Sequence, residues 1–368
     1  LANGNANYGG AIQMGTTWTG YDANAYIANV RFINNTATTS GGAIYNAGGK
    51  SIYGNNNLTV VNCTFINGKA NYAAAIETHS DSTIINSVFR NNTLTGDYGD
   101  GAAIRMNGRT TTIEGCVFEN NKAPVDKATI SVQSGSLNVT YSVFLDEGKA
   151  ISAKSSYYDR VHVDYNFWGT NDKPVSKVDN GITINNWIIV DSKLDTADIN
   201  ASEKAPIISE FKLTNDGTSF EALNKTVPDV TISYVPTIGK VSQVNVTMVN
   251  NKATTTYTAT TEGNETVKVT VNGNVLSELK FAVGKSVEGK IFVSDAIGDD
   301  YNGHDGSRLK PYKTIGRAIS QAKTGNTIYV YSGVYTFTSY SLISKDLTII
   351  GLGDVIINRT ASSYSPYI

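Results

Sequence analysis

Several residue types are scarce in this sequence, and each shortage excludes a class of protein. Only 17% of the 368 residues are charged and the formal net charge is −2, whereas about 25% of residues are charged in an average soluble domain. No basic surface for nucleic acid is therefore expected. Two cysteines cannot form a disulfide framework. The three histidines, His79, His162 and His304, fall in separate segments without metal-ligand spacing.

Long apolar runs and prolines are scarce as well. No apolar run approaches the roughly 18 residues of a membrane helix, so no membrane span is expected in this segment. Residues 1–8 have neither the basic start nor the apolar stretch of a signal peptide, so we expect a mature chain or one excised from a longer one. The sequence has 7 prolines but 34 glycines, and Asn, Thr, Val, Ile and Tyr recur throughout. This composition is typical of many short strands joined by polar turns, and it predicts an all-β fold.

The first half of the sequence contains a repeat. Residues 9–12 read Gly-Gly-Ala-Ile, and the same slot ends in isoleucine six times, at Ile12, Ile44, Ile76, Ile104, Ile130 and Ile151. A second series places one ring in each repeat, at Phe32, Phe65, Phe89, Phe118, Phe144 and Trp168. Repeats of about 20–30 residues with short β-rich runs are typical of solenoids. We therefore predict parallel β-helix coils over residues 1–190, with equivalent residues stacked on one another.

Two further columns accompany the rings. Two residues after each ring stands a polar side chain, and we expect these to form an amide ladder: Asn34, Asn67, Asn91, Asn120 and Asp146. Two residues before each ring stands mostly a small group: Val30, Cys63, Ser87, Cys116, Ser142 and Asn166. The two cysteines lie two coils apart in this column, a separation of about 10 Å at the usual strand spacing, which is too long for a disulfide. We predict two buried free thiols.

These repeats resemble those of a known class of surface proteins. Gly-Gly-Ala-Ile and Phe-x-x-Asn, the latter at residues 32–35, 89–92 and 118–121, resemble right-handed parallel β-helix repeats of polymorphic surface proteins and of adhesin-like proteins of methanogenic archaea. Residues 166–171, Asn-Phe-Trp-Gly-Thr-Asn, resemble the Asn-Tyr-Trp-Gly signature that closes a β-helix in the methanogen proteins. The resemblance implies an extracellular, cell-surface or cell-envelope location.

The middle of the chain follows a different pattern. Residues 191–204 are polar and without repeats, so we predict a linker there. Over residues 205–287, alternating apolar and polar positions predict short strands at 231–235, 244–249, 254–259, 266–271 and 275–283, with Asn272-Gly273 as a hairpin turn. About seven strands without helix signals predict an Ig-like β-sandwich. It is similar to the spacer domains that follow the β-helices of the methanogen proteins.

The last part, residues 288–368, contains the one convincing helix pattern. It covers residues 311–322, with Thr314 as N-cap, and strand patterns surround it. This block resembles the N-terminal cap and first coils of many parallel β-helix proteins, including some polysaccharide lyases. A helix there would cover the open end of a β-stack. Asp295 and the loop from Asp299 to Asp305 offer oxygen ligands for calcium, but a turn-forming role is favoured because EF-hand spacing is lacking.

Candidate chemistry is sparse. The outward column beside the isoleucines places Glu77 next to Arg105, with His79 and Tyr45 nearby. The favoured interpretation is a solvated salt bridge worth at most about 1 kcal/mol, and a ligand contact, such as a carbohydrate on Tyr45, is the alternative. No second carboxylate stands in the column, as a glycosidase pair would require. We therefore predict no catalytic, cofactor-binding or metal-binding residue.

Glycosylation is a further hypothesis, because Asn-x-Ser/Thr acceptors are frequent. The candidates are Asn57, Asn91, Asn138, Asn200, Asn224, Asn245, Asn264 and Asn358. Asn62 also precedes such a motif, but we expect it to be inaccessible because it adjoins Cys63.

Together these patterns predict a non-enzymatic, extracellular structural or adhesive protein that forms a rigid rod, a fibre or a sheath-like assembly. The expected partners are copies of the protein, or further repeats of a longer chain, joined head to tail, and also cell-surface glycans. No cofactor is expected. A polysaccharide lyase-like enzyme and an adhesin with a specific ligand remain as alternatives, because the fold hosts all three functions.

Overall fold

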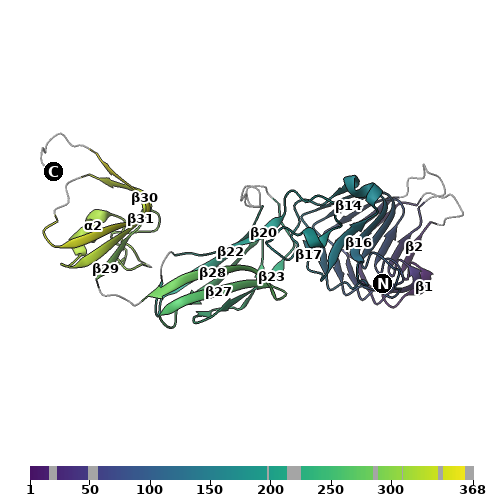
Figure 1. The fold of residues 1–368 in the computed structure, drawn as a ribbon, viewed down its shortest axis with the longest axis horizontal. Coiled ribbons are helices and arrows are strands. Elements are labelled where there is room, and N and C mark those ends of the chain that lie inside the picture. The colour runs from purple at the N-terminus through teal and green to yellow at the C-terminus, as the bar shows by residue number, and fades with distance from the viewer. Residues whose placement is uncertain are drawn as a thin grey trace.

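A computed structural model gives the fold of the chain, and it describes residues 1–15, 23–48, 57–196, 199–213, 225–284, 289–308, 310–338 and 343–360. Three parts follow one another along the long axis: coiled parallel strands, a two-sheet sandwich, and a smaller part with the one α-helix of these residues (Figure 1). The prediction of an all-β fold with a parallel β-helix and an Ig-like sandwich is confirmed.

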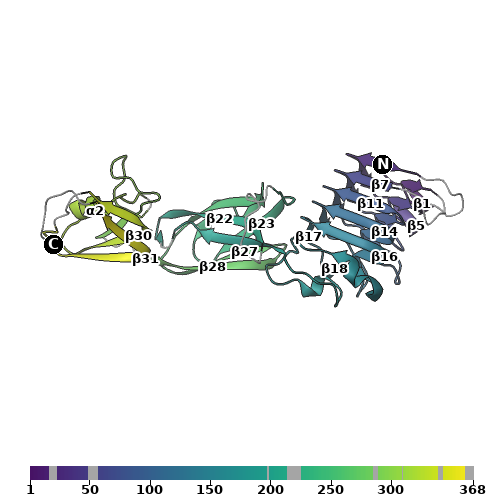
Figure 2. The ribbon, with the colours of Figure 1, turned by 90° about the horizontal axis from the view of Figure 1, so that it is seen from above.

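Parallel strands of successive coils build the sheets of the N-terminal β-helix, where they lie side by side (Figure 2). A four-stranded sheet contains β1 (Asn5–Tyr8), β5 (Thr36–Ser40), β9 (Lys69–Ala70) and β13 (Thr93–Leu94). A five-stranded sheet contains β4 (Arg31–Ile33), β8 (Thr64–Ile66), β12 (Val88–Arg90), β15 (Val117–Glu119) and β17 (Val143–Phe144).

The largest sheet has ten strands. Its members are β2 (Ile12–Met14), β3 (Ala25–Ala28), β6 (Ile44–Asn46), β7 (Asn57–Val61), β10 (Ile76–Thr78), β11 (Asp81–Ile85), β14 (Ile104–Glu114), β16 (Ala128–Thr140), β18 (Lys149–Ala153) and β19 (Val161–His162). A 3-10 helix, Ser155–Arg160, lies between β18 and β19, and a second one, Val175–Lys177, follows β19.

The stacking of equivalent residues is confirmed. The six isoleucines pair in register, each with the next, from Ile12 to Ile151. The rings from Phe32 to Trp168 stack with centroids 4.7–5.0 Å apart and planes within 13° of parallel. All of these rings are buried. One strand spacing per ring places them within the range in which aromatic pairs attract beyond their burial.

Left-handed residues make the corners of each coil and explain why Asn and Gly are abundant. Three columns have positive φ: Gly9, Gly41, Ala73 and Gly101; Asn29, Asn62, Asn86, Gly115, Tyr141 and Tyr165; and Asn34, Asn67, Asn91 and Asn120. This backbone region costs most L-residues about 1–2 kcal/mol, and Gly and Asn enter it most readily. The first glycine of Gly-Gly-Ala-Ile is therefore a corner residue.

The predicted amide ladder is confirmed where Asn67 Nδ2 donates to Asn34 Oδ1 at 3.0 Å, and a second, buried ladder runs beside it. The column that begins with Asn34 lies at the exposed left-handed corner. The buried ladder comes one residue later, where Asn92 Nδ2 donates to Asn121 Oδ1 at 2.8 Å and the Asn121 backbone N–H donates to Asp146 Oδ1 at 2.7 Å. Because the corner residue is left-handed, the following residue turns into the coil. Asp146 alone lies in the predicted column and in the buried ladder.

The small-residue column is a hydrogen-bond ladder. The backbone N–H of Cys63 donates to Ser87 Oγ at 3.0 Å, and that of Ser87 donates to Cys116 Sγ at 3.4 Å. The N–H groups of Cys116 and Ser142 donate in the same way to Ser142 Oγ and Asn166 Oδ1, at 3.1 and 2.9 Å. Both cysteines are buried and free, as predicted. Burial raises the pKa of Cys116 to about 12, so it remains a thiol.

The five-stranded sheet of the β-helix runs into the sandwich. Phe167 bridges Val143 on one side and Ile188, the first residue of β20 (Ile188–Leu194), on the other. β20 then pairs antiparallel with β22 (Lys204–Leu213) in a sheet that also contains β26 (Lys252–Thr258) and β24 (Lys240–Val241). The segment 191–204, expected to be a linker, thus supplies part of β20 and also β21 (Ile199–Asn200).

The second sheet of the sandwich contains β21, β28 (Asn274–Gly284), β27 (Gly263–Val271), β23 (Val230–Pro236) and β25 (Asn245–Met248). The predicted strands are all present with ends shifted by up to three residues. Asn272 and Gly273 both have positive φ, as a two-residue hairpin turn requires. Buried side chains of both sheets form one core together with Val143 and Phe167 of the β-helix.

The C-terminal part is a small sheet covered by the helix. Parallel strands β29 (Lys290–Val293), β30 (Asn326–Phe337) and β31 (Leu347–Arg359) form the sheet, and α2 (Ile315–Gln321) packs on it with Ile315, Ala318 and Ile319 buried. The helix is shorter than the predicted 311–322, but Thr314 caps it as predicted and accepts from the Arg317 N–H at 3.1 Å. No described helix is long and apolar enough to cross a membrane.

Candidate functional site

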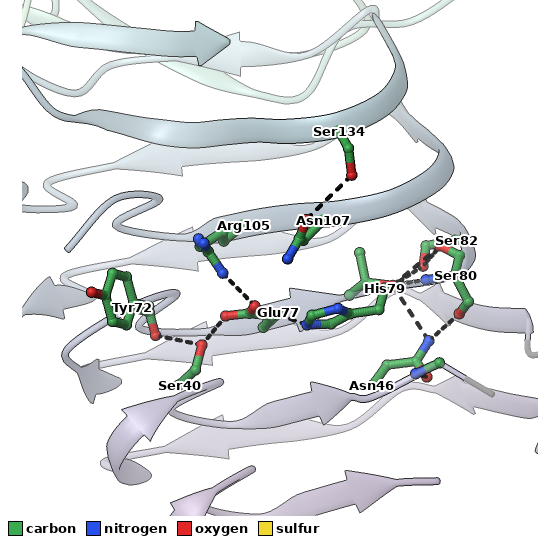
Figure 3. A network of polar contacts seen from close by, with 12 residues as sticks. Ser40, Asn46, Tyr72, Glu77, His79, Ser80, Ser82, Arg105, Asn107 and Ser134 are labelled. Carbon is green, nitrogen blue, oxygen red and sulfur yellow. Dashed lines mark hydrogen bonds and ion pairs between the residues drawn. The ribbon is translucent and has the colours of Figure 1, made fainter. Parts of the chain in front are cut away.

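Three consecutive coils bring the predicted contact residues together around one buried carboxylate. Tyr45 lies on β6, Glu77 on β10 and Arg105 on β14, and the three are paired in register. His79 follows the end of β10. Ser40, at the end of β5, and Tyr72, just before β10, complete this group, which we call the Glu77 cluster (Figure 3).

Hydrogen bonds and ion pairs engage both oxygens of the Glu77 carboxylate. Its Oε1 lies 2.5 Å from Arg105 Nη1 and 2.9 Å from His79 Nε2, and its Oε2 accepts from the Ser40 hydroxyl. Glu77 is only 2% exposed. The predicted ion pair with Arg105 is therefore confirmed, but its description as a solvated surface pair is wrong. Ser40 and Tyr72 come from the corner beside the column and cover it.

The surroundings of Glu77 favour its charged form. Burial alone would raise the pKa of Glu77, but the hydrogen bond from His79, the charge of Arg105 and the hydrogen bond from Ser40 outweigh it. The pKa of Glu77 therefore lies below its ordinary value. At neutral pH this group is a carboxylate and cannot supply a proton as a general acid.

Aromatic rings surround the cluster. Tyr45 is buried between Tyr8, at a ring distance of 4.7 Å, and His79, at 5.6 Å. The Arg105 guanidinium lies 5.1 Å from the centre of the Tyr72 ring. Burial and then the charge of Glu77 raise the pKa of Tyr45, so it remains a neutral phenol. The arrangement ties coils together and leaves Tyr8, Tyr72, His79 and Arg105 partly accessible.

Column reading of the sequence missed Ser40 and Tyr72. Both stand immediately before the left-handed corner residue of their coil, as do Tyr8 and Asp100. The position before each corner residue could have identified Ser40 and Tyr72 from the sequence, because residues at this position lie beside the strand that follows the corner. Among the described residues, no second carboxylate bonds to a member of the Glu77 cluster.

The carboxylates of the acidic loop in the C-terminal part accept hydrogen bonds from backbone N–H groups. Asp299 accepts from the Tyr301 N–H at 2.8 Å, and Asp305 accepts from the Ser307 N–H at 2.9 Å. Asp300 accepts from the N–H groups of Lys313 and Thr314. The contacts of Asp299 and Asp305 are those of turn formation, whereas Asp300 ties the loop to the residues before α2. Within the described residues, no three His, Cys, Asp or Glu side chains are placed to hold a metal ion.

The glycosylation candidates differ in accessibility. The exposed ones are Asn57, Asn91, Asn245, Asn264 and Asn358, and Asn138 and Asn200 are half-buried. Asn224 lies outside the described residues. The expectation that Asn62 is inaccessible is wrong, because Asn62 is an exposed left-handed corner residue.

Comparison with known proteins gives few matches. Residues 296–340 match the family model "Protein of unknown function (DUF1565)", and no curated protein matches the chain. Among solved structures, the D0-D1 domain of intimin is 22% identical over 26% of this chain and 48% of that one, with a TM-score of 0.20. A C-terminal 282-residue intimin fragment in complex with the intimin-binding domain of the translocated intimin receptor is 24% identical over 33% of this chain and 40% of that one, with a TM-score of 0.21.

These structural likenesses are too low to support a fold or a function. The chain spans less than half of either intimin fragment. The family match covers the acidic loop, α2 and β30, which is a small part of the chain.

Proposed function

We propose that this protein is a structural or adhesive element of a cell surface, in which the β-helix and the sandwich act as one stiff rod. The joint between these two parts is the observation that carries the proposal. One sheet crosses it through Phe167 and Ile188, and the ring of Phe167 lies 5.3 Å from that of Phe211 in the sandwich.

Further contacts fix the angle at the joint. The Asn171 side chain donates to Val190 O and accepts from the Val190 N–H, both at 2.8 Å, which imitates one rung of a strand ladder. Lys225 Nζ forms an ion pair with Oε1 of Glu114, the last residue of β14, at 3.2 Å. A hydrophobic core and a sheet shared by two domains oppose bending, whereas a flexible linker would permit it.

Small-angle scattering of the purified chain tests the stiffness. We expect a particle whose longest dimension matches the extended arrangement of Figure 1, with a narrow distribution of shapes. Asn171→Ala removes both bonds to Val190 and should broaden the distribution, while Asn107→Ala, on the β-helix and away from the joint, should leave it unchanged. A wild-type chain that is bent or strongly heterogeneous between the β-helix and the sandwich would contradict the proposal.

The rod extends, in this proposal, by adding further coils head to tail, from other copies or from further repeats of a longer chain. The edge of β31 supports it. Ile349 is 43% exposed and Ile356 is 54% exposed, whereas Ile328 in the neighbouring strand β30 is fully buried. Exposed apolar strand edges recruit another strand, and a heterologous contact that does not close gives a filament.

Sedimentation velocity over a range of concentrations tests assembly from copies. Association should rise with concentration and should be abolished by Ile356→Lys, which places a charge on the edge. Val125→Lys is the matched control, because Val125 is 88% exposed away from β31. A monomer at every concentration would reject assembly from separate copies.

The absence of enzymatic activity and the extracellular location are part of the same proposal. The ion-paired and ionised carboxylate of Glu77 supports the absence of enzymatic activity. The resemblance of the repeats to those of surface proteins supports the extracellular location. Depolymerisation of a polysaccharide that is lost in Glu77→Ala would contradict the first. Failure of antibodies to label intact cells would contradict the second.

A further inference from the structure

A cavity opens beside the helix of the C-terminal part, in the segment that matches the family of unknown function. Its volume is about 530 Å³, which lies within the roughly 300–1,000 Å³ of pockets that bind small molecules. The walls come from Asp295 after β29, from the start of α2, and from the end of β30. The binding chemistry of the cavity follows from its charged side chains.

Two cations line the cavity wall, Lys313 before the N-cap of α2 and Arg317 within the helix. Neither has an ion pair among the described residues. The guanidinium of Arg317 lies 5.6 Å from the centre of the Tyr312 ring, and its Nε is shielded from solvent without a hydrogen-bond partner. A buried guanidinium N–H without an acceptor is costly, so an anion in the cavity would supply the unmet bond.

Some backbone amides near the start of α2 already have acceptors. Asp300 accepts from the N–H groups of Lys313 and Thr314, and the Thr314 hydroxyl accepts from that of Arg317. The charged groups of the cavity wall are the side chains of Lys313, Arg317 and Asp295.

The rest of the lining favours a ligand with hydroxyl groups. Thr336 in β30, Thr338 just after it and Asp295 after β29 line the cavity and are exposed. Phe337 also lines the cavity, is half-buried and adds an apolar group to the wall. Carboxylate and hydroxyl oxygens pair with the hydroxyls of a sugar ring, and an aromatic ring packs on its C–H groups.

We propose that this cavity binds a carboxylate-bearing saccharide, a hexuronate unit, with the carboxylate on Arg317 and Lys313 and the ring hydroxyls on Asp295 and the two threonines. A ligand that is only an anion would leave Asp295 without a role, because the Asp295 carboxylate repels an anion. In a uronate, the ring hydroxyls of the ligand lie between its carboxylate and Asp295. A neutral sugar would leave the two cations unpaired. The inference does not depend on the rod proposal, since it concerns a cavity within the C-terminal part.

Isothermal titration of the full chain with D-glucuronate tests the proposal, with D-glucose and inorganic phosphate as comparison ligands. We expect binding of glucuronate at least tenfold tighter than of glucose or phosphate. Arg317→Met keeps the stem of the side chain but removes its charge, and it should weaken glucuronate binding at least tenfold. Lys323→Met is the matched control, because Lys323 is exposed just beyond α2 and outside the cavity, and it should bind like the wild type.

The variant Asp295→Asn distinguishes recognition of the sugar hydroxyls from recognition of the anionic group. It should weaken glucuronate binding, because one of the two acceptor oxygens becomes an NH2 donor, while phosphate binding stays equal or tightens as the negative charge is lost. Phosphate binding as tight as glucuronate binding would overturn the saccharide assignment, and glucose binding as tight would overturn the role of the cations. No measurable binding of glucuronate, in a chain whose melting profile is native, would overturn the site itself.

Discussion

The N-terminal β-helix and the C-terminal coil use the same strand pattern but differ in what lies on either side of each strand. In the β-helix, Ile44 and Ile104 have a coil above and below and are fully buried. In the C-terminal part, Ile328 has two neighbouring strands and is buried, but Ile349 in β31 has one and is 43% exposed. In a stacked fold, whether an isoleucine is buried thus depends on whether its strand has a neighbouring strand on both sides.

The two regions also differ at their ends. The sandwich covers the last coil of the β-helix and shares a core with it through Phe167. In the C-terminal part, α2 covers one side of the sheet while the outer edge of β31 has no partner among the described strands. Stability in such stacks is a sum over neighbour contacts, so substitutions in the two regions should have very different costs.

The largest expected effect tests this contrast directly. Phe89→Ala, in the middle of the ring column, should destabilise the β-helix by about 4 kcal/mol, because a buried ring is lost and its neighbours cannot close the gap. Ile349→Ala should cost less than about 1 kcal/mol. Trp18, Trp168 and Trp187 all lie within residues 1–190, so tryptophan fluorescence in urea follows the β-helix, and calorimetry follows the whole chain. Equal costs for the two variants would refute the contrast.

The next effect compares a buried ion pair with an exposed one. Glu77→Gln should cost about 3 kcal/mol, because Arg105 loses its partner while only 19% of its side chain is exposed. Glu119→Gln is the control. It breaks the more exposed pair with Arg90 and should cost at most about 1 kcal/mol.

The same pair predicts a pH dependence. The pKa of Glu77 is lowered in the folded chain, so its stabilisation is present above the ordinary pKa of 4.5 and is lost as pH falls through the folded value. The difference in unfolding free energy between the wild type and Glu77→Gln should therefore shrink below about pH 4.5. A difference that stays constant down to pH 2 would show that the charge of Glu77 does not contribute.

The smallest effects concern the left-handed corners. Gly101 has a φ of +79°, and a Cβ there would lie 2.4 Å from the Ile104 carbonyl oxygen, so Gly101→Ala should cost about 2 kcal/mol. Ala73 occupies the equivalent corner with a φ of +48°. Ala73→Gly should therefore stabilise the β-helix by about 0.5–1 kcal/mol. Opposite signs for these two substitutions, read by tryptophan fluorescence in urea, would verify the assignment of the corner.

The sequence was sufficient for the stacked columns but not for the details of the corners. The positions of the stacked rings and isoleucines could be predicted because these residues recur at regular intervals in the sequence. The exposed amide ladder at Asn34 and Asn67 was predicted, but the buried ladder one residue later was not, since a period cannot tell that the residue after the left-handed corner turns into the coil. The helix began later than expected because residues before Ile315 are held by other contacts: Tyr312 bridges Val293, and Asp300 binds the Lys313 N–H.

The candidate site was predicted in part for the same reason. The adjacency of Glu77 and Arg105 follows from the register of neighbouring coils. Their burial does not, because it depends on Ser40 and Tyr72, which reach the pair from a different column. The cavity beside α2 had no sequence signal either, since its walls come from segments about 20 residues apart whose relative placement only the fold provides.

A double-mutant cycle on the ring column tests the stacking of coils most directly. Phe65 and Phe89 stack at 4.8 Å, so Phe65→Leu and Phe89→Leu should show a coupling of about 1 kcal/mol in the β-helix transition. Phe32 and Phe118 are separated by two intervening rings, so the same substitutions there should be additive. Additivity in both cycles would contradict the stack, and with it the rod.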